Sequence, residues 1–174
     1  MTSGAARDSS GETPLMYAAR SNANPGVMKE LLDAGARPDE RDSFGETPLM
    51  KAASFNPSPE IVRLLLAAGA AVDKTDEFGV TPLMLAAEHN ASPEVLRVLV
   101  SAGARINRKN ANGMTPLMFA AELARSPRMI VLLLEAGADP SMKNGSGQTA
   151  LMLAACNQGL AGSDELAALA RASH

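Results

Sequence analysis

Cysteine, tryptophan and long apolar runs are nearly or wholly absent from this sequence. The single cysteine, Cys156, excludes an intramolecular disulfide, so a reducing, cytoplasmic setting is the simplest interpretation. No stretch is apolar and long enough to insert into a membrane or to act as a signal peptide. The formal net charge is −3 and no basic run occurs. The electrostatic attraction that would favour nucleic acids or anionic membranes as partners is therefore missing.

Residues arranged for catalysis are also missing. The two histidines are His89 and His174, and neither lies in a motif with a serine or cysteine nucleophile. Cys156 follows two alanines, and a small half-buried residue is a simpler interpretation of it than a reactive thiol. The glycines at positions 145 and 147 do not form a phosphate-binding loop. We therefore expect no enzymatic activity, no cofactor, no metal and no small-molecule substrate.

What the sequence does contain is a repeated phrase. Gly-x-Thr-Pro-Leu-Met occurs four times, and a fifth copy reads Gly-Gln-Thr-Ala-Leu-Met. A second phrase, Leu-Leu-x-Ala-Gly-Ala or a close variant, runs in step with the first. The shared threonines lie 34 residues apart, at Thr13, Thr47, Thr81, Thr115 and Thr149. A period of this length indicates a stack of similar units, each of which buries its apolar face on its neighbours.

One unit, residues 43–76, illustrates the local structure that each copy predicts. Thr47 and Pro48 start a first helix, because threonine caps the first turn and proline has its φ already set. A second helix follows Ser58, which is expected to cap it, and ends at Gly69, which suits the left-handed position after a helix. The remainder is rich in turn residues and is expected to project as a hairpin-like finger.

This order of turn, two helices and finger resembles the ankyrin repeat, in the phrase Gly-x-Thr-Pro-Leu, the paired alanines, the Leu-Leu and the Gly-Ala. The resemblance covers residues 9 to about 171 and implies an all-α solenoid of helix-turn-helix units with β-hairpin-like fingers. We expect a single domain over residues 1–174, with repeats at approximately 9–42, 43–76, 77–110, 111–144 and 145–174. The first repeat resembles an N-terminal cap, because Glu30 stands in an otherwise apolar column, and the last resembles a C-terminal cap whose final helix runs from Ser163 to Arg171.

The sequence departs from the family pattern at two places in each unit. The histidine that usually follows Thr-Pro-Leu is a methionine, at Met16, Met50, Met84, Met118 and Met152. We expect packing of the flexible thioether to replace the hydrogen bonds of that histidine. A copper-binding methionine ladder is the weaker alternative, because neighbouring helices lie about 8–10 Å apart. The link between the helices, at 22–25, 56–59, 90–93 and 124–127, is one residue longer than usual, which we interpret as a structural variant.

Asp and Asn recur in two columns of the fingers. One column holds Asp39, Asp73 and Asn107, and the other holds Asp42, Asp76, Asn110 and Asn144. Such side chains shape turns by accepting hydrogen bonds from their own backbone, or serve as calcium ligands. We favour turn shaping, which is the use that the family makes of these columns.

The family binds its partners through the finger tips and the open side of the first helices, which together form a concave groove. On this sequence these columns supply the candidate partner-binding residues Tyr17, Arg41, Phe44, Lys51, Phe55, Phe78, Val80, Leu85, His89, Lys109, Met114, Phe119 and Leu123. The set includes all five aromatic residues of the chain, and aromatic side chains are enriched where binding energy is concentrated.

The apolar members gather in the third and fourth repeats. There, an exposed patch is expected from Phe78, Val80, Leu85, Met114, Phe119 and Leu123. The alternative is that Leu85 and Phe119 are half-buried between helices, and that Phe44 and Phe78 pack along their own fingers. The resemblance implies a non-catalytic protein–protein interaction module, with this patch as its centre and Arg41, Lys51 and Lys109 as a polar rim. The alternative function is a structural or assembly role with self-association through the patch, although we expect a monomer.

Overall fold

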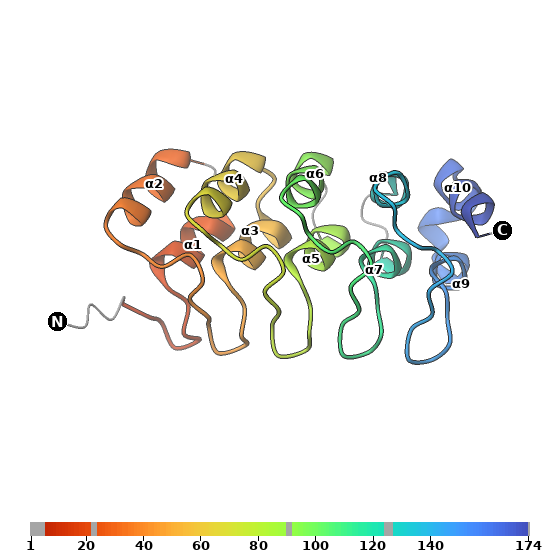
Figure 1. Ribbon diagram of the computed structural model, residues 1–174, viewed down its shortest axis with the longest axis horizontal. Coiled ribbons are helices and arrows are strands. Elements are labelled where there is room, and N and C mark those ends of the chain that lie inside the picture. The colour runs from red at the N-terminus through yellow and green to blue at the C-terminus, as the bar shows by residue number, and fades with distance from the viewer. Residues whose placement is uncertain (1–5, 22–23, 90–91, 124–126, 174) are drawn as a thin grey trace.

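The helices stack side by side in two parallel rows (Figure 1). The computed structural model describes residues 6–21, 24–89, 92–123 and 127–173, and this part of the chain contains helices but no strand. The inner row consists of α1 (Pro14–Ser21), α3 (Pro48–Phe55), α5 (Pro82–His89), α7 (Pro116–Leu123) and α9 (Ala150–Cys156). The outer row consists of α2 (Pro25–Asp33), α4 (Pro59–Ala67), α6 (Pro93–Ser101), α8 (Arg128–Glu135) and α10 (Asp164–Ala172), and the 3-10 helix η1 (Gln158–Leu160) joins α9 to α10. The expected all-α solenoid is confirmed.

The inner helices begin at a capping box in which methionine is a partner. In α3, the Thr47 hydroxyl accepts a hydrogen bond from the Met50 N–H over 3.3 Å, and the Met50 sulfur accepts one from the Thr47 N–H over 3.4 Å. A glutamate or glutamine usually makes the second of these bonds. The same two bonds recur at the threonines that start α1, α5 and α7.

The expectation that the methionines pack is confirmed in the first four repeats, where each is buried, but it is incomplete because the sulfur is also a hydrogen-bond acceptor. In the fifth repeat the expectation is wrong, since Met152 is 54% exposed. The physical reason is that α9 has an inner-row neighbour, α7, on one side only, as Figure 1 shows.

The outer helices end as the sequence predicts but begin differently. Gly69 has a φ of +93°, and its N–H donates to the Leu66 carbonyl while the Ala70 N–H donates to the Leu65 carbonyl, which is a Schellman arrangement. Ser58 stands at the N-cap of α4, but its side chain makes no capping bond, so that expectation is wrong.

An asparagine fixes the start of α4 instead. The Asn56 side-chain oxygen accepts from the Ser58 N–H over 3.0 Å, and its amide nitrogen donates to the Ala19 carbonyl over 2.9 Å. This second bond joins α3 to α1, and the Asn157 amide similarly donates from the end of α9 to the Ala121 and Glu122 carbonyls of α7. The link 56–59 is wholly described, whereas the links at 22–25, 90–93 and 124–127 contain residues outside the described part of the chain.

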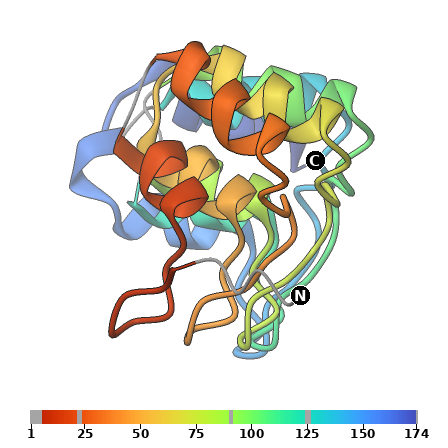
Figure 2. The same ribbon diagram turned by 90° about the vertical axis from the view of Figure 1, so that its left-hand side faces the viewer.

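The fingers project from the edge of the helical layers, as the end-on view shows (Figure 2). At the tip of the second finger the Asp42 N–H donates to the Glu46 carbonyl, so the tip is hairpin-like although no strand is formed in the described residues. The Asp42 side chain accepts from the N–H groups of Phe44 and Glu46, both over 2.9 Å. The same pair of bonds is made at Asp8, Asp76, Asn110 and Asn144, which confirms turn shaping as a role of this column.

Small residues in the inner row allow the helices to approach closely. Ala52 and Ala53 in α3 are fully buried, and so is Leu49 beside them. The final helix α10 is capped by the Ser163 hydroxyl, which accepts from the Leu166 N–H over 3.1 Å, and it packs on α8 and α9. The predicted C-terminal helix is thereby confirmed.

Candidate functional site

A groove runs where the inner helices meet the fingers. One hollow in it has a volume of about 800 Å³ and lies between α7 and the fourth and fifth fingers. Phe119 and Glu122 of α7 line it on one side, and Asn112 and Ser146 of the fingers line it on the other. This shared lining shows that finger tips and inner-helix side chains face one space, as a concave binding surface requires.

A buried ionic cluster lies at the N-terminal end of the groove. The Lys51 ammonium is 2.8 Å from the Asp42 carboxylate and 3.0 Å from the Glu12 carboxylate, and it is also paired with Glu46. Arg20 adds a second contact to Glu12, over 3.4 Å. The cluster joins α3 to the first two fingers, and because three carboxylates meet two cations it keeps an excess of negative charge.

The protonation of Lys51 follows from its surroundings. Burial by itself lowers the pKa of a lysine, because a charged group loses its hydration. The hydrogen bonds of the Lys51 ammonium to Asp42, Glu46 and Glu12 outweigh that effect and raise its pKa above the ordinary value. Lys51 is therefore charged at neutral pH and holds the two repeats together. Its side chain is only 6% exposed, so it contributes no free cation to the rim of the groove.

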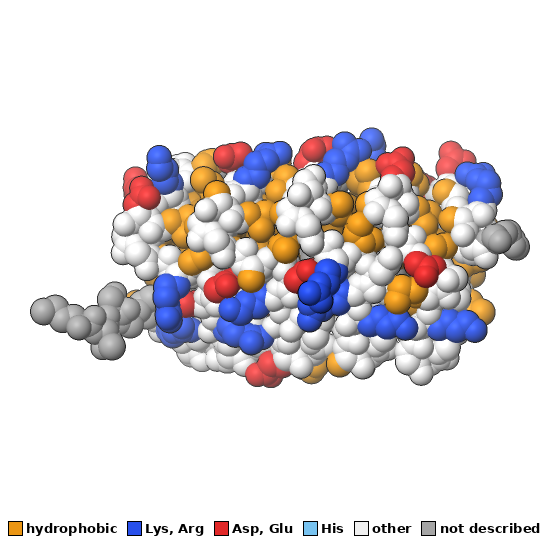
Figure 3. Space-filling model, in the orientation of Figure 1, with side chains coloured by type: hydrophobic (Ala, Val, Ile, Leu, Met, Phe, Trp, Pro, Cys, Tyr) orange, Lys and Arg blue, Asp and Glu red, His pale blue; other side chains and the backbone are white. Residues whose placement is uncertain are grey.

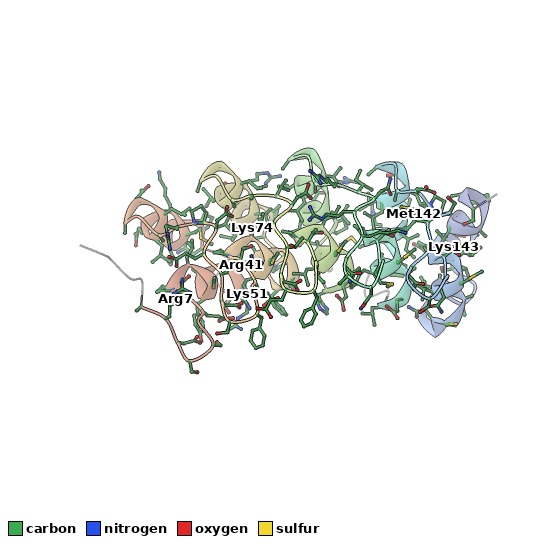
Figure 4. The ribbon with its side chains drawn as sticks, turned by 60° about the horizontal axis from the view of Figure 1, so that its bottom comes forward. Arg7, Arg41, Lys51, Lys74, Met142 and Lys143 are labelled. Carbon is green, nitrogen blue, oxygen red and sulfur yellow. The ribbon has the colours of Figure 1, made fainter. Side chains whose placement is uncertain are left out.

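Basic side chains tie several of the fingers to their neighbours. The Arg7 guanidinium donates to the Arg41 carbonyl over 2.8 Å, Arg41 donates to the Thr75 carbonyl, and Lys109 donates to the Lys143 carbonyl over 2.7 Å. In Figure 4, Arg7, Arg41 and Lys74 lie near one another in the N-terminal half, and Met142 and Lys143 lie on the last finger. A row of Lys and Arg side chains with some acidic neighbours crosses the face seen in Figure 3.

The Asp and Asn column that begins with Asp39 also joins the fingers. The side-chain oxygens of Asp39, Asp73 and Asn107 accept hydrogen bonds from the N–H groups of Ala71, Arg105 and Asp139, one repeat further along. The bonds are 2.8 to 3.0 Å long. These oxygens therefore stabilise the stack of repeats. Turn shaping, which was expected of both columns, does not describe the bonds that this column makes to the next repeat.

Aromatic rings are displayed on the groove side of the first three repeats. Tyr17 donates its hydroxyl to Asp8 over 2.6 Å, and the Arg20 guanidinium lies 5.1 Å from the centre of the Tyr17 ring. The hydrogen bonds from Tyr17 and Ser10 lower the pKa of Asp8 to about 2, and the same bond to Asp8 raises the pKa of Tyr17.

One repeat further along, the Phe55 ring stacks on the imidazole of His89. The two rings are nearly parallel, at 9°, with their centres 6.2 Å apart. Phe55 is 55% exposed, so much of the ring still faces solvent. The stack places a flat, half-apolar surface on the open side of α3 and α5.

The thirteen predicted site residues fall into three groups by exposure. The exposed ones are Tyr17, Arg41, Phe44, Phe55, Phe78, Lys109 and Leu123. His89 and Phe119 are half-buried, and Lys51, Val80, Leu85 and Met114 are buried. The expected polar rim therefore offers fewer free charges than the sequence predicts. Lys51 is enclosed by carboxylates, and the charged ends of Arg41 and Lys109 are bonded to main-chain carbonyls.

The exposed apolar area expected in the third and fourth repeats is reduced to Phe78 and Leu123. Val80 and Leu85 pack with Met50 and Met84 in a second apolar cluster, and Phe119 covers that cluster from the next repeat. Met50 and Met84, from two of the Thr-Pro-Leu-Met phrases, are thus the buried partners of these groove residues. The alternative stated for Leu85 and Phe119, half-burial between helices, is closer to what the structure shows.

Sequence reasoning missed the carboxylates around Lys51 and the arginine that contacts them. Two features of the sequence could have indicated this cluster. The glutamates of Gly-Glu-Thr-Pro, Glu12 and Glu46, stand one period apart, and only the second repeat has a lysine five residues after its glutamate. The sequence pattern places Asn56 in a long link, but its bond to Ala19 depends on the distance between helices of different repeats, which no local pattern reports.

The described residues show no other candidate for chemistry. They contain no group of three or more His, Cys, Asp or Glu side chains placed to hold a metal ion. Cys156 is exposed, so the expectation that it is half-buried is wrong. No helix within the described ranges is long and apolar enough to cross a membrane.

Comparison with known proteins adds one finding. A family model described as ankyrin repeats (3 copies) matches residues 15–110, 55–144 and 92–169, which together span most of the chain. Curated proteins were also compared, and none of them matches.

Proposed function

The chain belongs to the ankyrin-repeat family, and from this premise we propose that it is a non-catalytic module that binds a protein partner through its concave groove and finger tips. Ankyrin repeats generally mediate protein–protein interaction and are typically non-catalytic. A cytoplasmic location is part of the same proposal, and fractionation of the native cell tests it.

The observation that carries the proposal is the exposure of aromatic side chains. Tyr17, Phe44, Phe55 and Phe78 are 44% to 65% exposed, although the chain has only five aromatic residues. Fully burying a phenylalanine side chain contributes about 1.5–3 kcal/mol, and these half-exposed rings forgo a part of that energy. Rings of this kind, held by a rigid scaffold, supply large contact areas at low entropic cost when a partner covers them.

We place the energetic centre of the groove on the finger tips of the second and third repeats. Phe44 and Phe78 occupy the same position on neighbouring fingers, and they are the most exposed large apolar side chains among the described residues. The fingers that carry them are fixed by the Asx bonds of Asp42 and Asp76 and by Arg41. The rings are thus presented on a preorganised surface, which lowers the entropic cost of binding.

Affinity capture from the native cell, followed by measurement with the purified partner, tests this function. Phe78→Ala and Phe44→Ala are each expected to weaken binding by more than about 1 kcal/mol, the usual loss at an anchoring ring. Arg97→Ala, on the exposed face of the outer helix α6, is the control and should leave the affinity unchanged. Equal affinity of wild type and every groove variant would contradict the proposal.

Self-association has less support. The apolar patch through which it was expected is mostly internal, because Val80, Leu85 and Met114 are at most 9% exposed. We therefore propose a monomer. Sedimentation velocity at several protein concentrations distinguishes the two, since a sedimentation coefficient that rises with concentration would favour assembly.

A further inference from the structure

We infer that the partner segment held by the groove is basic, with arginine or lysine side chains that lie over the exposed phenylalanine rings of the second and third fingers. This inference rests on the proposed function and adds the chemistry of the partner. Three observations support it. Arg20 contacts a ring and a carboxylate within this chain, the next two fingers each carry an exposed ring and a carboxylate, and the charge of the groove differs along its length.

Arg20 shows how this surface holds a cation. Its guanidinium lies 5.1 Å from the centre of the Tyr17 ring and 3.4 Å from the Glu12 carboxylate. A ring face and a carboxylate attract a guanidinium together, the first through its quadrupole and the second through its charge. In the first repeat the chain supplies that cation itself. We expect an arginine or lysine of the partner to contact a ring and a carboxylate in the same way.

The next two fingers also present a ring and a carboxylate, and the arginine of the second finger, Arg41, donates its hydrogen bonds to the Gly45 and Thr75 carbonyls. Phe44 is 59% exposed and lies two residues before Glu46, whose side chain is 22% exposed at the edge of the Lys51 cluster. Phe78 is 65% exposed and follows Glu77, an exposed residue for which the described part of the chain contains no ion pair. The two exposed rings and the Glu77 carboxylate can therefore accept a cation from outside.

These two finger tips form one surface. The Glu77 side chain lies beside Gly45 of the neighbouring finger, where a Cβ at Gly45 would be 3.2 Å from the Glu77 Cγ and 3.2 Å from a guanidinium nitrogen of Arg41. The carboxylate of the third finger therefore lies beside the tip that carries Phe44. A partner cation at these tips meets the Glu77 carboxylate and the excess negative charge of the Lys51 cluster, beside the Arg41 guanidinium that is bonded to main-chain carbonyls.

The charge changes sign further along the groove. Lys109 and Lys143 line the hollow beside α7, where Glu122 is the acidic residue of the lining. A basic segment is attracted to the first three repeats and not to the fourth and fifth. We therefore place a basic stretch of a protein partner across the second and third fingers.

Three synthetic peptides that differ only in charge test the inference. The first alternates arginine with glycine and serine, and the others carry glutamine or glutamate in place of arginine. Each is titrated into the full chain, with affinity from calorimetry and location from amide chemical shifts. We expect the arginine peptide to bind about tenfold more tightly than the glutamine peptide, since two ring contacts and the neighbouring carboxylates add. Its shifts should centre on residues 43–46 and 77–80, and its affinity should fall as salt is added.

Two matched variants sharpen the test. Phe78→Ala and Glu77→Gln should each weaken the arginine peptide about threefold, the size of one exposed cation–π or ion-pair contact. Glu60→Gln, an exposed carboxylate on the outer helix α4, should have no effect. The inference is overturned if the glutamine or glutamate peptide binds as tightly as the arginine peptide, or if the shifts centre on the outer helices.

The partner itself separates this inference from the proposed function. A captured partner whose binding is lost with Phe78→Ala, but whose contacting segment is acidic or uncharged, overturns the inference and leaves the proposed function standing. A partner that is insensitive to every groove variant contradicts the proposed function. A basic contacting segment, with binding weakened by Glu77→Gln, supports both.

Discussion

The sulfur of Met50 accepts a hydrogen bond from the main-chain N–H of Thr47 at 3.4 Å, inside the fully buried start of α3. Replacing Met50 by leucine keeps the volume but removes the acceptor, so the Thr47 N–H is left without a partner. We expect Met50→Leu to lower the free energy of unfolding by about 1 kcal/mol and to speed hydrogen exchange at Thr47. Urea unfolding and amide exchange measure the two effects. Met152→Leu is the control, because Met152 is exposed, and it should change stability by less than about 0.5 kcal/mol.

The Lys51 cluster should be essential for docking the first repeat onto the second. Lys51→Met leaves the carboxylates of Glu12, Asp42 and Glu46 facing one another, and loss of one partner from a buried ion pair costs about 3 kcal/mol. Urea unfolding measures this loss. Lys29→Met, at an exposed position, should be close to neutral. If Lys51→Met is as stable as wild type, the cluster does not hold the repeats together.

The pH dependence of the same cluster has a defined sign. The pKa of Lys51 is raised in the folded protein, so its contribution to stability is complete below the pKa of an unfolded lysine, about 10.4. That contribution is lost as the pH rises through the folded value. Melting temperatures measured at increasing alkaline pH should therefore fall more steeply for wild type than for Lys51→Met. Parallel curves would contradict this.

The bond between Tyr17 and Asp8 can be measured directly. Tyr17 is the only tyrosine, so the near-ultraviolet absorbance of phenolate reports its titration alone. Its pKa is raised from 10.0 because its hydroxyl donates to the Asp8 carboxylate. The neutral form stabilises the fold below pH 10.0, and this contribution is lost as the pH rises through the folded value. Asp8→Asn should bring the midpoint back toward 10.0, and an unchanged midpoint in this variant would show that the bond does not form.

Asn56 should matter more than its place in a linker suggests. Its amide donates to the Ala19 carbonyl in the neighbouring repeat, and Asn56→Ala leaves that buried carbonyl without this donor. We expect a loss of about 1–2 kcal/mol in the free energy of unfolding. Asn112→Ala, at an exposed finger tip, is the comparison and should lose less than about 0.5 kcal/mol. Equal losses for the two variants would remove the special role of Asn56.

Much of the fold follows from local patterns. The start of α3 at Pro48, the end of α4 before Gly69 and the C-terminal helix after Ser163 were all predictable, because caps and left-handed glycines act within a few residues. The absence of a capping bond from the Ser58 side chain was not predictable, because the Asn56 side-chain oxygen accepts the hydrogen bond from the Ser58 N–H. Competition between neighbouring polar side chains is decided by geometry, and the sequence pattern does not report it.

The candidate site was predicted less well than the fold. The position of a residue within its repeat predicts that it lies on the groove side. It does not predict that Phe78 is exposed whereas Leu85 is buried with Met84. Nor does it show that Lys51 is surrounded by carboxylates. Whether a groove residue is free or engaged depends on contacts between repeats, which arise only when the units are stacked.

Hydrogen exchange of the chain in complex with its captured partner tests the central claim most directly. If the groove is the binding surface, added protection should appear at the finger tips around residues 43–46 and 77–80 and along α3 and α5. The outer helices α2, α4 and α6 should exchange as in the free chain. Protection confined to those outer helices, with the finger tips unchanged, would contradict the account.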